Sequence, residues 1–216
     1  MAATWLTRAE TCSSLAAVTT AWAHGRIPLL VIALLAHDTA GAVVPDLDAL
    51  RSRYAGEYEF IGGSAERASV PAAVERSVDG MFFIARGIAY DRLLKSSQVC
   101  ERYTLDFAAS RVSVAGSCRT PDVSPADGSE VEHRTRQGET SKLSQKFVGD
   151  TLVQEFRGDE GARKVVWTLL PDGNTLQAQV LITSKHLPRP VEYALTYRRK
   201  VSTGTVADGG QGDAGR

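Results

Sequence analysis

The feature that most constrains the fold is a series of short segments in which apolar and polar residues alternate, separated by tight turns. It occupies much of the second half of the 216-residue chain. Four turn sequences interrupt it: Arg136-Gln137-Gly138, Gly149-Asp150, Gly158-Asp159-Glu160-Gly161 and Pro171-Asp172-Gly173-Asn174. Turns of this composition between alternating segments are typical of antiparallel hairpins, and each one fixes the register of the two strands that it joins.

Counting outward from these four turns gives one consistent inner face. Its expected cross-strand pairs are Val131 with Leu143, Leu143 with Phe156, Gln145 with Gln154, Phe156 with Arg163, Gln154 with Val165, Leu152 with Trp167, Trp167 with Ala178 and Leu169 with Leu176. The same count places His133 opposite Ser141. Agreement between successive hairpins is strong evidence for a single sheet. We therefore predict a mainly β chain that forms an antiparallel up-and-down β-barrel of about 8–10 strands.

The segments before and after this series complete the predicted barrel. A first strand contains Tyr58 and Phe60 on one face, and Gly62-Gly63 ends it. Two short helices follow: the first begins near Ser69, and Gly87 separates it from a second one that runs through Leu94. The apolar face expected for this helical pair consists of Val74, Val78, Met81, Phe82 and Ala85. The last strand covers 191–200 and is expected to pair with the first strand, which would close the barrel.

The predicted inner face carries polar groups among its apolar residues. Arg163, Gln145 and Gln154 all point inward in this register. An unpaired buried amide or charge is costly, so these side chains indicate an interior that holds water or a ligand. The alternative is that their row lies near an open end of the barrel. Arg163 would then reach water, and the two glutamines would bond each other across the strands.

The order of elements resembles a known family. The segment Gly56-Glu57-Tyr58-Glu59-Phe60, then two helices, then hairpins ending in Tyr193-Ala194-Leu195-Thr196-Tyr197-Arg198, is similar to the calycin barrels. The helices between the first and second strands resemble those of the fatty-acid-binding proteins. In that family an Arg-x-Tyr sequence on the last strand holds the ligand carboxylate. Here Tyr197 matches but Leu195 replaces the arginine, which leaves Arg163 as a substitute. The resemblance extends to lipocalin-like domains that bacteria export.

Two functional hypotheses follow from the barrel. The first is an exported lipocalin-like barrel, expected to be a monomer, that binds a lipid or other hydrophobic small molecule such as a fatty acid or lysolipid. Its expected ligand-binding residues are Tyr58, Phe60, Gln145, Gln154, Phe156, Arg163, Trp167, Tyr193 and Tyr197. The second is a ligand-free structural or protein-interaction module of the cell envelope, with an interior filled by the same aromatic side chains.

The N-terminal segment indicates export. Residues 27–36 form an apolar run that follows Arg26 and precedes an Ala-x-Ala cleavage pattern at Ala40 and Ala42. The run is about half the ~20 residues that a membrane-spanning helix needs, so we predict a signal peptide and no transmembrane anchor in the mature chain. A buried helix is the alternative, and the long segment before the run is also compatible with a start codon assigned too far upstream. The expected division is a leader at 1–42, a lipocalin-like domain at 43–202 and a disordered Gly- and Asp-rich tail at 203–216. The expected location is periplasmic or extracellular.

Removal of the leader would leave two cysteines, Cys100 and Cys118, which suggests a disulfide in an exported protein. The register of the intervening hairpin bears on this prediction. Placing the cysteines directly opposite each other mixes polar and apolar faces. Pairing Leu105 with Val112 or Val114 restores the faces but displaces the cysteines, and a bulge could reconcile the two.

Composition and motifs narrow the function further. The chain has 25 Lys and Arg against 25 Asp and Glu, which argues against a nucleic-acid binder. The sequence contains no H-E-x-x-H, C-x-x-C, P-loop or G-x-S-x-G motif, so we expect no catalytic residues, no metal and no cofactor. His133 beside Ser141 could serve as a general base, although such a histidine is more often a hydrogen-bonded wall residue.

Overall fold

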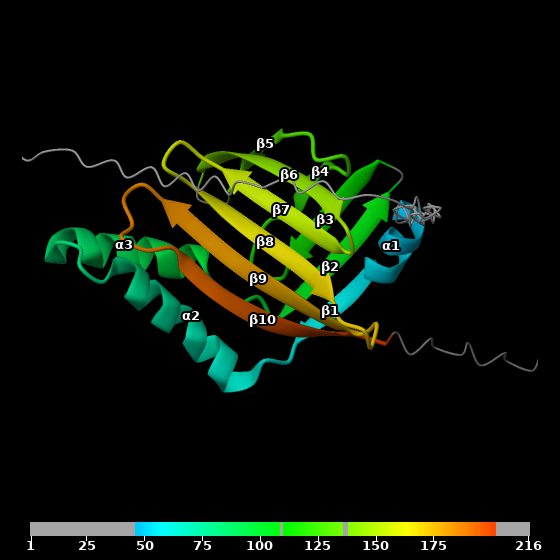
Figure 1. Cartoon of the computed structure of the whole chain (residues 1–216), viewed down its shortest axis with the longest axis horizontal. Helices are drawn as coiled ribbons and strands as arrows, with labels where there is room; N and C mark the ends of the chain where they lie inside the picture. The colour runs from blue at the N-terminus through cyan, green and yellow to red at the C-terminus, as the bar shows by residue number, and fades with distance from the viewer. Residues whose placement is uncertain (1–45, 109, 136–137, 202–216) are drawn as a thin grey trace, which may run out of the picture. The chain divides into compact units, whose positions relative to one another are not determined.

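The computed structural model describes residues 46–201, apart from 109, 136 and 137. The leader expected at 1–42 and the tail expected at 203–216 lie outside the described residues. Three helices and ten strands make up the described part (Figure 1). The helices are α1 (Leu47–Tyr54), α2 (Gly63–Val78) and α3 (Phe83–Ser96). The strands are β1 (Gly56–Phe60), β2 (Arg102–Ala108), β3 (Arg111–Gly116), β4 (Asp122–Pro125), β5 (Val131–Arg134), β6 (Thr140–Val148), β7 (Thr151–Arg157), β8 (Gly161–Leu169), β9 (Thr175–Ser184) and β10 (Val191–Arg199).

The strands form one antiparallel sheet that curves into a nearly closed barrel. Their order is β4-β3-β2-β1-β10-β9-β8-β7-β6-β5, so neighbours in the sheet are neighbours in the chain everywhere except at the junction of β1 with β10. That junction places Phe60 opposite Tyr197, as expected for the first and last strands. The up-and-down barrel with a helix pair between β1 and β2 confirms the predicted fold class and the calycin-like arrangement.

No continuous ladder closes the barrel in the described part, where the end strand β4 faces β6, the neighbour of the other end strand β5. A single bridge joins Asp127 to Lys146. The side chain of Gln145 spans this seam between β4 and β6. The amide of Gln145 donates to the carbonyl oxygens of Val112 and Asp122 and to Ser124 Oγ, at 3.3, 3.2 and 3.1 Å. Among the described residues, one backbone bridge and the hydrogen bonds of one buried glutamine therefore join the two sides of this seam.

The hairpin registers predicted from the turns are confirmed. The structure pairs Val131 with Leu143, His133 with Ser141, Leu143 with Phe156, Gln145 with Gln154, Phe156 with Arg163, Gln154 with Val165, Leu152 with Trp167, Trp167 with Ala178 and Leu169 with Leu176. Two of the turns depend on glycines in the left-handed region, at φ +87° for Gly138 and +57° for Gly149. Residues with a side chain rarely adopt this conformation, which is why these positions anchor the register.

The helix pair is present, but its predicted boundaries are wrong. Helix α2 already begins at Gly63. Ser69 is inside it, and its hydroxyl donates to the carbonyl oxygen of Glu66. The break between the helices falls at Gly80, which has a φ of +88°, whereas Gly87 lies within α3. Val74 and Val78 are buried as expected, but Phe82 is 69% exposed. The turn at Gly80 therefore ends the buried apolar face of α2 before it reaches Phe82.

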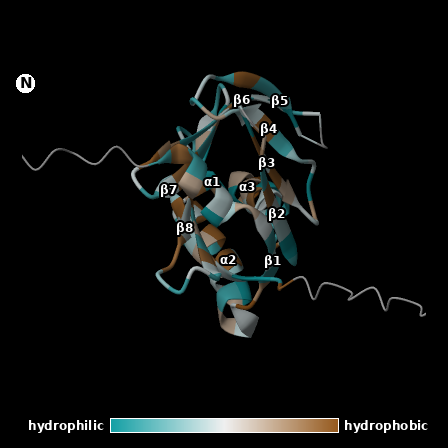
Figure 2. Cartoon of the chain, turned by 90° about the vertical axis from the view of Figure 1, so that its right-hand side faces the viewer, coloured by the Kyte–Doolittle hydropathy of each residue, from teal (hydrophilic) through white to brown (hydrophobic). Residues whose placement is uncertain are grey.

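Helix α1 was not expected, and it covers one end of the barrel. The Asp46 carboxylate accepts the backbone N–H groups of Asp48 and Ala49, which caps the helix. Leu50 and Tyr54 form its buried side. The Tyr54 hydroxyl accepts the N–H of Leu169, and it lies 2.5 Å from the carbonyl oxygen of Asp150. Figure 2 is viewed from this end and shows α1 in front of the space that the strands surround.

Candidate ligand site inside the barrel

A small cavity lies inside the barrel near the end of α3. Its polar lining consists of Gln98, Tyr103, Arg119, Asp122, Gln154, Arg163, Tyr193 and Tyr197, and its apolar lining consists of Val165, Trp167, Ala178, Val180 and Leu195. The cavity volume is about 10 Å³. That is room for about one water molecule, because large side chains fill the rest of the interior.

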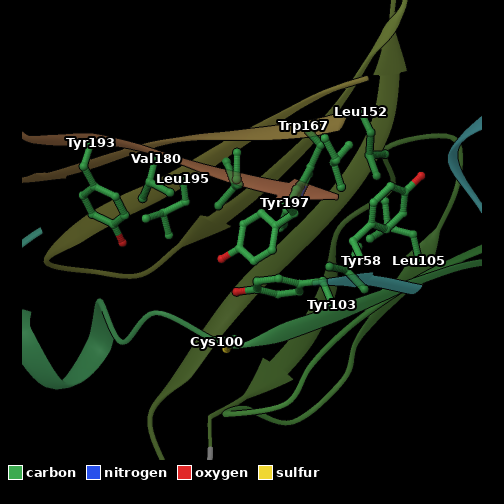
Figure 3. Close-up of a cluster of buried hydrophobic side chains, with 14 of the residues drawn as sticks. Tyr58, Cys100, Tyr103, Leu105, Leu152, Trp167, Val180, Tyr193, Leu195 and Tyr197 are labelled. Atoms are coloured by element: carbon green, nitrogen blue, oxygen red, sulfur yellow. The ribbon is translucent and has the colours of Figure 1, made fainter. Parts of the chain in front are cut away.

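Three aromatic side chains that contact one another line part of this cavity. Trp167 of β8 and Tyr197 of β10 both contact the ring of Tyr103 from β2 edge-on, with ring centroids 4.9 and 5.2 Å away (Figure 3). All three side chains are buried. Their positions follow from the alternation along the strands, which turns every second residue inward. The hydroxyl of Tyr197 is buried and has no hydrogen-bond partner among the described residues.

Asp122 supplies a buried carboxylate to the site. Residue Asp122 is only 3% exposed. Its Oδ2 accepts a hydrogen bond from Gln154 Nε2 at 3.1 Å, and its Oδ1 lies 3.4 Å from His133 Nε2. Burial raises the pKa of Asp122, and the nearby positive charge of Arg119 offsets only part of that rise. The carboxylate therefore lies among donors and cationic groups, but its ionised form is costly there.

Two arginines reach the same cavity from different elements. Arg163 extends inward from β8, and its Nη1 donates to the carbonyl oxygen of Ser96 at the end of α3, at 2.7 Å. Arg119 comes from the turn after β3, and its guanidinium lies 6.0 Å from the centre of the Tyr103 ring. In both arginines the Nε is buried without a partner among the described residues. Burial and the repulsion from Arg119 lower the pKa of Arg163.

The charges of this site are not balanced by the described residues that line it. Two guanidinium groups face a cavity to which Asp122 contributes the single lining carboxylate. Buried polar atoms without partners are rare in folded proteins, because each one loses its hydrogen bonds to water. Here three such atoms, on Arg119, Arg163 and Tyr197, come from side chains that line one cavity. This arrangement is complementary to a small anionic group.

The structure gathers five of the nine predicted ligand-binding residues around the cavity: Gln154, Arg163, Trp167, Tyr193 and Tyr197. The other four lie elsewhere. Gln145 is fully buried at the seam, and Tyr58 donates its hydroxyl to the carbonyl oxygen of Tyr54 at the end covered by α1. The ring of Phe60 contacts that of Tyr197, and the half-buried ring of Phe156 contacts that of His133.

The alternative for the inward glutamines holds in part. Gln154 Nε2 lies 3.4 Å from Gln145 Oε1, so the two amides do interact across the strands. However, both residues are buried, and Gln154 also accepts from Trp167 Nε1 and donates to Asp122. These amides belong to an interior polar network rather than to a solvated rim.

Four polar residues of the lining were missed from the sequence: Gln98, Tyr103, Arg119 and Asp122. Tyr103 lies two residues before Leu105, so the register that pairs Leu105 with Val114 places both on the inner face. That signal was present in the sequence. Arg119 and Asp122 follow β3 in a turn and a four-residue strand, where no turn motif sets the register.

The predicted disulfide is present in the structure. Cys100 and Cys118 are bonded, with their Cα atoms 5.1 Å apart. The strands pair Leu105 with Val114, which is the register that keeps apolar residues on one face. A turn after β3, closed by the N–H of Arg119 and the carbonyl oxygen of Gly116, takes the place of the suggested bulge.

The described residues contain no group of three or more His, Cys, Asp or Glu side chains that could hold a metal ion. Their helices include none that is long and apolar enough to span a membrane. His133 does not line the cavity, and its Nε2 lies 3.4 Å from Asp122 Oδ1. This placement matches a wall histidine that contacts a buried carboxylate.

Comparison with known proteins yields matches among solved structures only. No family model and no curated protein matches the sequence. A Schistosoma mansoni fatty acid binding protein in complex with arachidonic acid is 13% identical, with a TM-score of 0.43, over 69% of this chain and 98% of that one. A fatty-acid-binding protein from Drosophila melanogaster brain is 15% identical, with a TM-score of 0.42, over 67% and 98%. Caenorhabditis elegans lipid binding protein 8 is 6% identical, with a TM-score of 0.44, over 69% and 96%.

Proposed function

We propose that this barrel binds a single-chain amphiphile with an acidic head group, such as a fatty acid or an acidic lysolipid, one ligand to one monomer. The observation that carries the proposal is the excess of positive charge in the cavity. Arg119 and Arg163 face one carboxylate, and three buried polar atoms have no partner among the described residues. A ligand carboxylate or phosphate would supply both the missing charge and the missing acceptors.

The binding mode requires side chains to move. Sites for molecules of this size usually enclose about 300–1,000 Å³. The cavity here has a volume of about 10 Å³. An acyl chain therefore enters only if interior side chains change rotamer. The contact of Arg163 with the end of α3 is the one that a ligand anion would replace most directly.

The small cavity favours a second candidate function. A barrel whose interior is filled by Tyr103, Trp167 and Tyr197 needs no ligand and would serve as a structural or protein-interaction module of the cell envelope. Under this alternative, the half-buried Arg119 and Arg163 and the buried Asp122 form an interior charge network that adds specificity to the core.

Ligand titrations separate the two candidates. We expect laurate to bind at least about tenfold more tightly than dodecanol, which has the same chain without the charge. Binding can be followed by calorimetry and by native mass spectrometry. In a chain with Trp5→Phe and Trp22→Phe, Trp167 is the only tryptophan, so its fluorescence should change when laurate enters. Absence of binding by both probes would leave the filled barrel as the function.

A variant tests the arginine contact. Arg163→Ala should reduce laurate affinity about tenfold and bring it close to that of dodecanol, because one guanidinium is lost from the cavity. The matched control is Arg102→Ala on β2, an exposed arginine whose side chain is 55% accessible. Equal losses for laurate and dodecanol in Arg163→Ala would remove this residue from the head-group site.

Export remains part of the proposal. It is supported by the apolar run at 27–36 with its Ala-x-Ala pattern and by the Cys100–Cys118 disulfide, a bond typical of oxidising compartments. We expect the mature protein outside the cytoplasm to begin at Val43, which N-terminal sequencing of the secreted or periplasmic fraction would determine.

A further inference from the structure

The Cys100–Cys118 disulfide joins two segments that both contribute to the cavity. Cys100 follows Gln98 by two residues, and Cys118 directly precedes Arg119. Gln98 and Arg119 both line the cavity. The Sγ of Cys118 also lies 3.9 Å from the carbonyl oxygen of Gln98. The bond therefore links the segment between α3 and β2 to the turn after β3, which carries Arg119.

The packing around Gly116 shows how closely this turn is held. A Cβ at Gly116 would lie 2.9 Å from Cys100 Sγ, 2.9 Å from the Tyr103 ring and 3.0 Å from Arg119 Cγ. Real Cβ atoms essentially never come within 3.0 Å of a neighbour, so a side chain at position 116 would force Cys100 or Tyr103 to shift. The ring of Tyr103 occupies the space left opposite Gly116, its partner in the register, and the Arg119 guanidinium lies over that ring.

Few backbone hydrogen bonds hold the turn that carries Arg119, and only one of them is made by Arg119 itself. The described residues provide two backbone bonds for its turn, from the Ser117 N–H to the Arg102 carbonyl oxygen at 2.9 Å and from the Arg119 N–H to the Gly116 carbonyl oxygen at 3.2 Å. Strand β4 does not begin until Asp122. The guanidinium is attached by a long flexible side chain, and its Nε has no partner in the described part of the chain. A covalent bond one residue away is the strongest restraint available to this turn.

We infer that the Cys100–Cys118 disulfide is a positioning element for Arg119 and thereby sets the preference of the barrel for acidic ligands. This inference rests on the proposed function. Without the bond, the turn between β3 and β4 gains freedom, and Arg119 can leave the cavity for water. Affinity for an acid should then fall, while affinity for an uncharged ligand of the same length should change little.

The test compares acid and alcohol affinities in the full-length chain. Laurate and dodecanol are titrated into the wild type, Cys100→Ser/Cys118→Ser, Arg119→Gln and the triple variant, with circular dichroism confirming that each is folded. We expect the ratio of laurate to dodecanol affinity to fall about tenfold in the first two variants. The triple variant should show no further fall, because the disulfide and the arginine act on the same contact.

A stability control separates positioning from general loosening. Leu50→Ala removes a side chain that is 3% exposed in α1, at the other end of the barrel, so it lowers stability without touching the turn. It should leave the affinity ratio unchanged. If the double cysteine variant does not fold, Gly116→Ala takes its place, since its Cβ displaces the same turn with the disulfide intact.

The outcomes distinguish the two proposals. Wild-type protein that binds neither probe, or binds both equally, contradicts the proposed function. Wild-type protein that prefers laurate, with the same preference in Cys100→Ser/Cys118→Ser, contradicts only the positioning role. A fall in the ratio for Leu50→Ala as large as that for the cysteine variant would likewise overturn it, because the loss would then follow stability rather than the position of Arg119.

Discussion

At the scale of single residues, Asp122 is the most consequential side chain in the interior. It accepts from Gln154, approaches His133 and faces the two arginines of the cavity. These contacts favour the ionised carboxylate, while its burial disfavours it. Burial is the larger effect, so the pKa of Asp122 is raised. The ionised form of Asp122 therefore lowers the stability of the folded chain.

This imbalance gives a pH prediction. Because the pKa of Asp122 is higher in the folded chain than in the unfolded chain, its ionisation opposes folding once the pH exceeds the folded pKa. As the pH falls toward the ordinary Asp value of 3.8, this cost disappears. The free energy of unfolding of the wild type, minus that of Asp122→Asn, should therefore increase on acidification from neutral pH to about pH 4.

Urea denaturation at several pH values measures this difference. Asp106→Asn, which replaces an exposed acid on β2, is the matched control and should show no comparable trend. A difference that decreases on acidification would mean that the contacts with Arg119, His133 and Gln154 outweigh burial, and the raised pKa would be wrong.

The sequence predicted Arg163 but not Arg119, for a physical reason. Arg163 lies on β8, and a turn of recognisable sequence at each end of β8 fixes its register. Counting residues from either turn places the Arg163 side chain on the inner face. Arg119 lies beside a disulfide, a glycine and an aromatic ring that come together only in the folded chain. Local rules assign a face to a residue within a strand, but they do not assign a direction to a residue in a turn.

At the scale of elements, local sequence rules predicted the hairpins correctly but not the boundaries of the helices. The hairpins β5 to β9 were placed correctly because Gly, Asp and Asn in their turns act over two to four residues. The helix boundaries were not, since a continuous apolar spacing from Val74 to Ala85 crosses the turn at Gly80. Helical periodicity alone does not show that the chain changes direction inside a periodic segment.

Two substitutions test this division of the helix pair. Val74→Ala should lower the free energy of unfolding by about 2 kcal/mol, because Val74 is fully buried between α2 and the barrel. Phe82→Ala, which introduces no capping side chain at the start of α3, should change it by less than about 0.5 kcal/mol, because Phe82 is 69% exposed. Thermal and urea denaturation give both values. Similar losses of stability at the two positions would mean that Phe82 is buried, as helical periodicity predicts.

At the scale of the whole molecule, closure of the barrel is uneven. Backbone ladders join nine neighbouring pairs of strands, from β4 round to β5. The seam between β4 and β6 has one isolated bridge and the side chain of Gln145 instead. The seam also adjoins the cavity, because Gln154 bonds both Gln145 and Asp122. The least paired part of the barrel is therefore next to its most polar part, so an opening of the seam would expose the charged lining.

Gln145→Leu tests how much this one side chain contributes to closure. Leucine removes the donor for the Val112 and Asp122 carbonyl oxygens and for Ser124, so we expect a loss of about 2 kcal/mol in the free energy of unfolding. Amide hydrogen exchange should accelerate in β4 before it does in β9, which is paired on both sides. Gln179→Leu, an exposed glutamine on β9, is the matched control and should alter neither quantity. Exchange that accelerates equally in β4 and β9 would show that the seam opens only when the entire barrel unfolds.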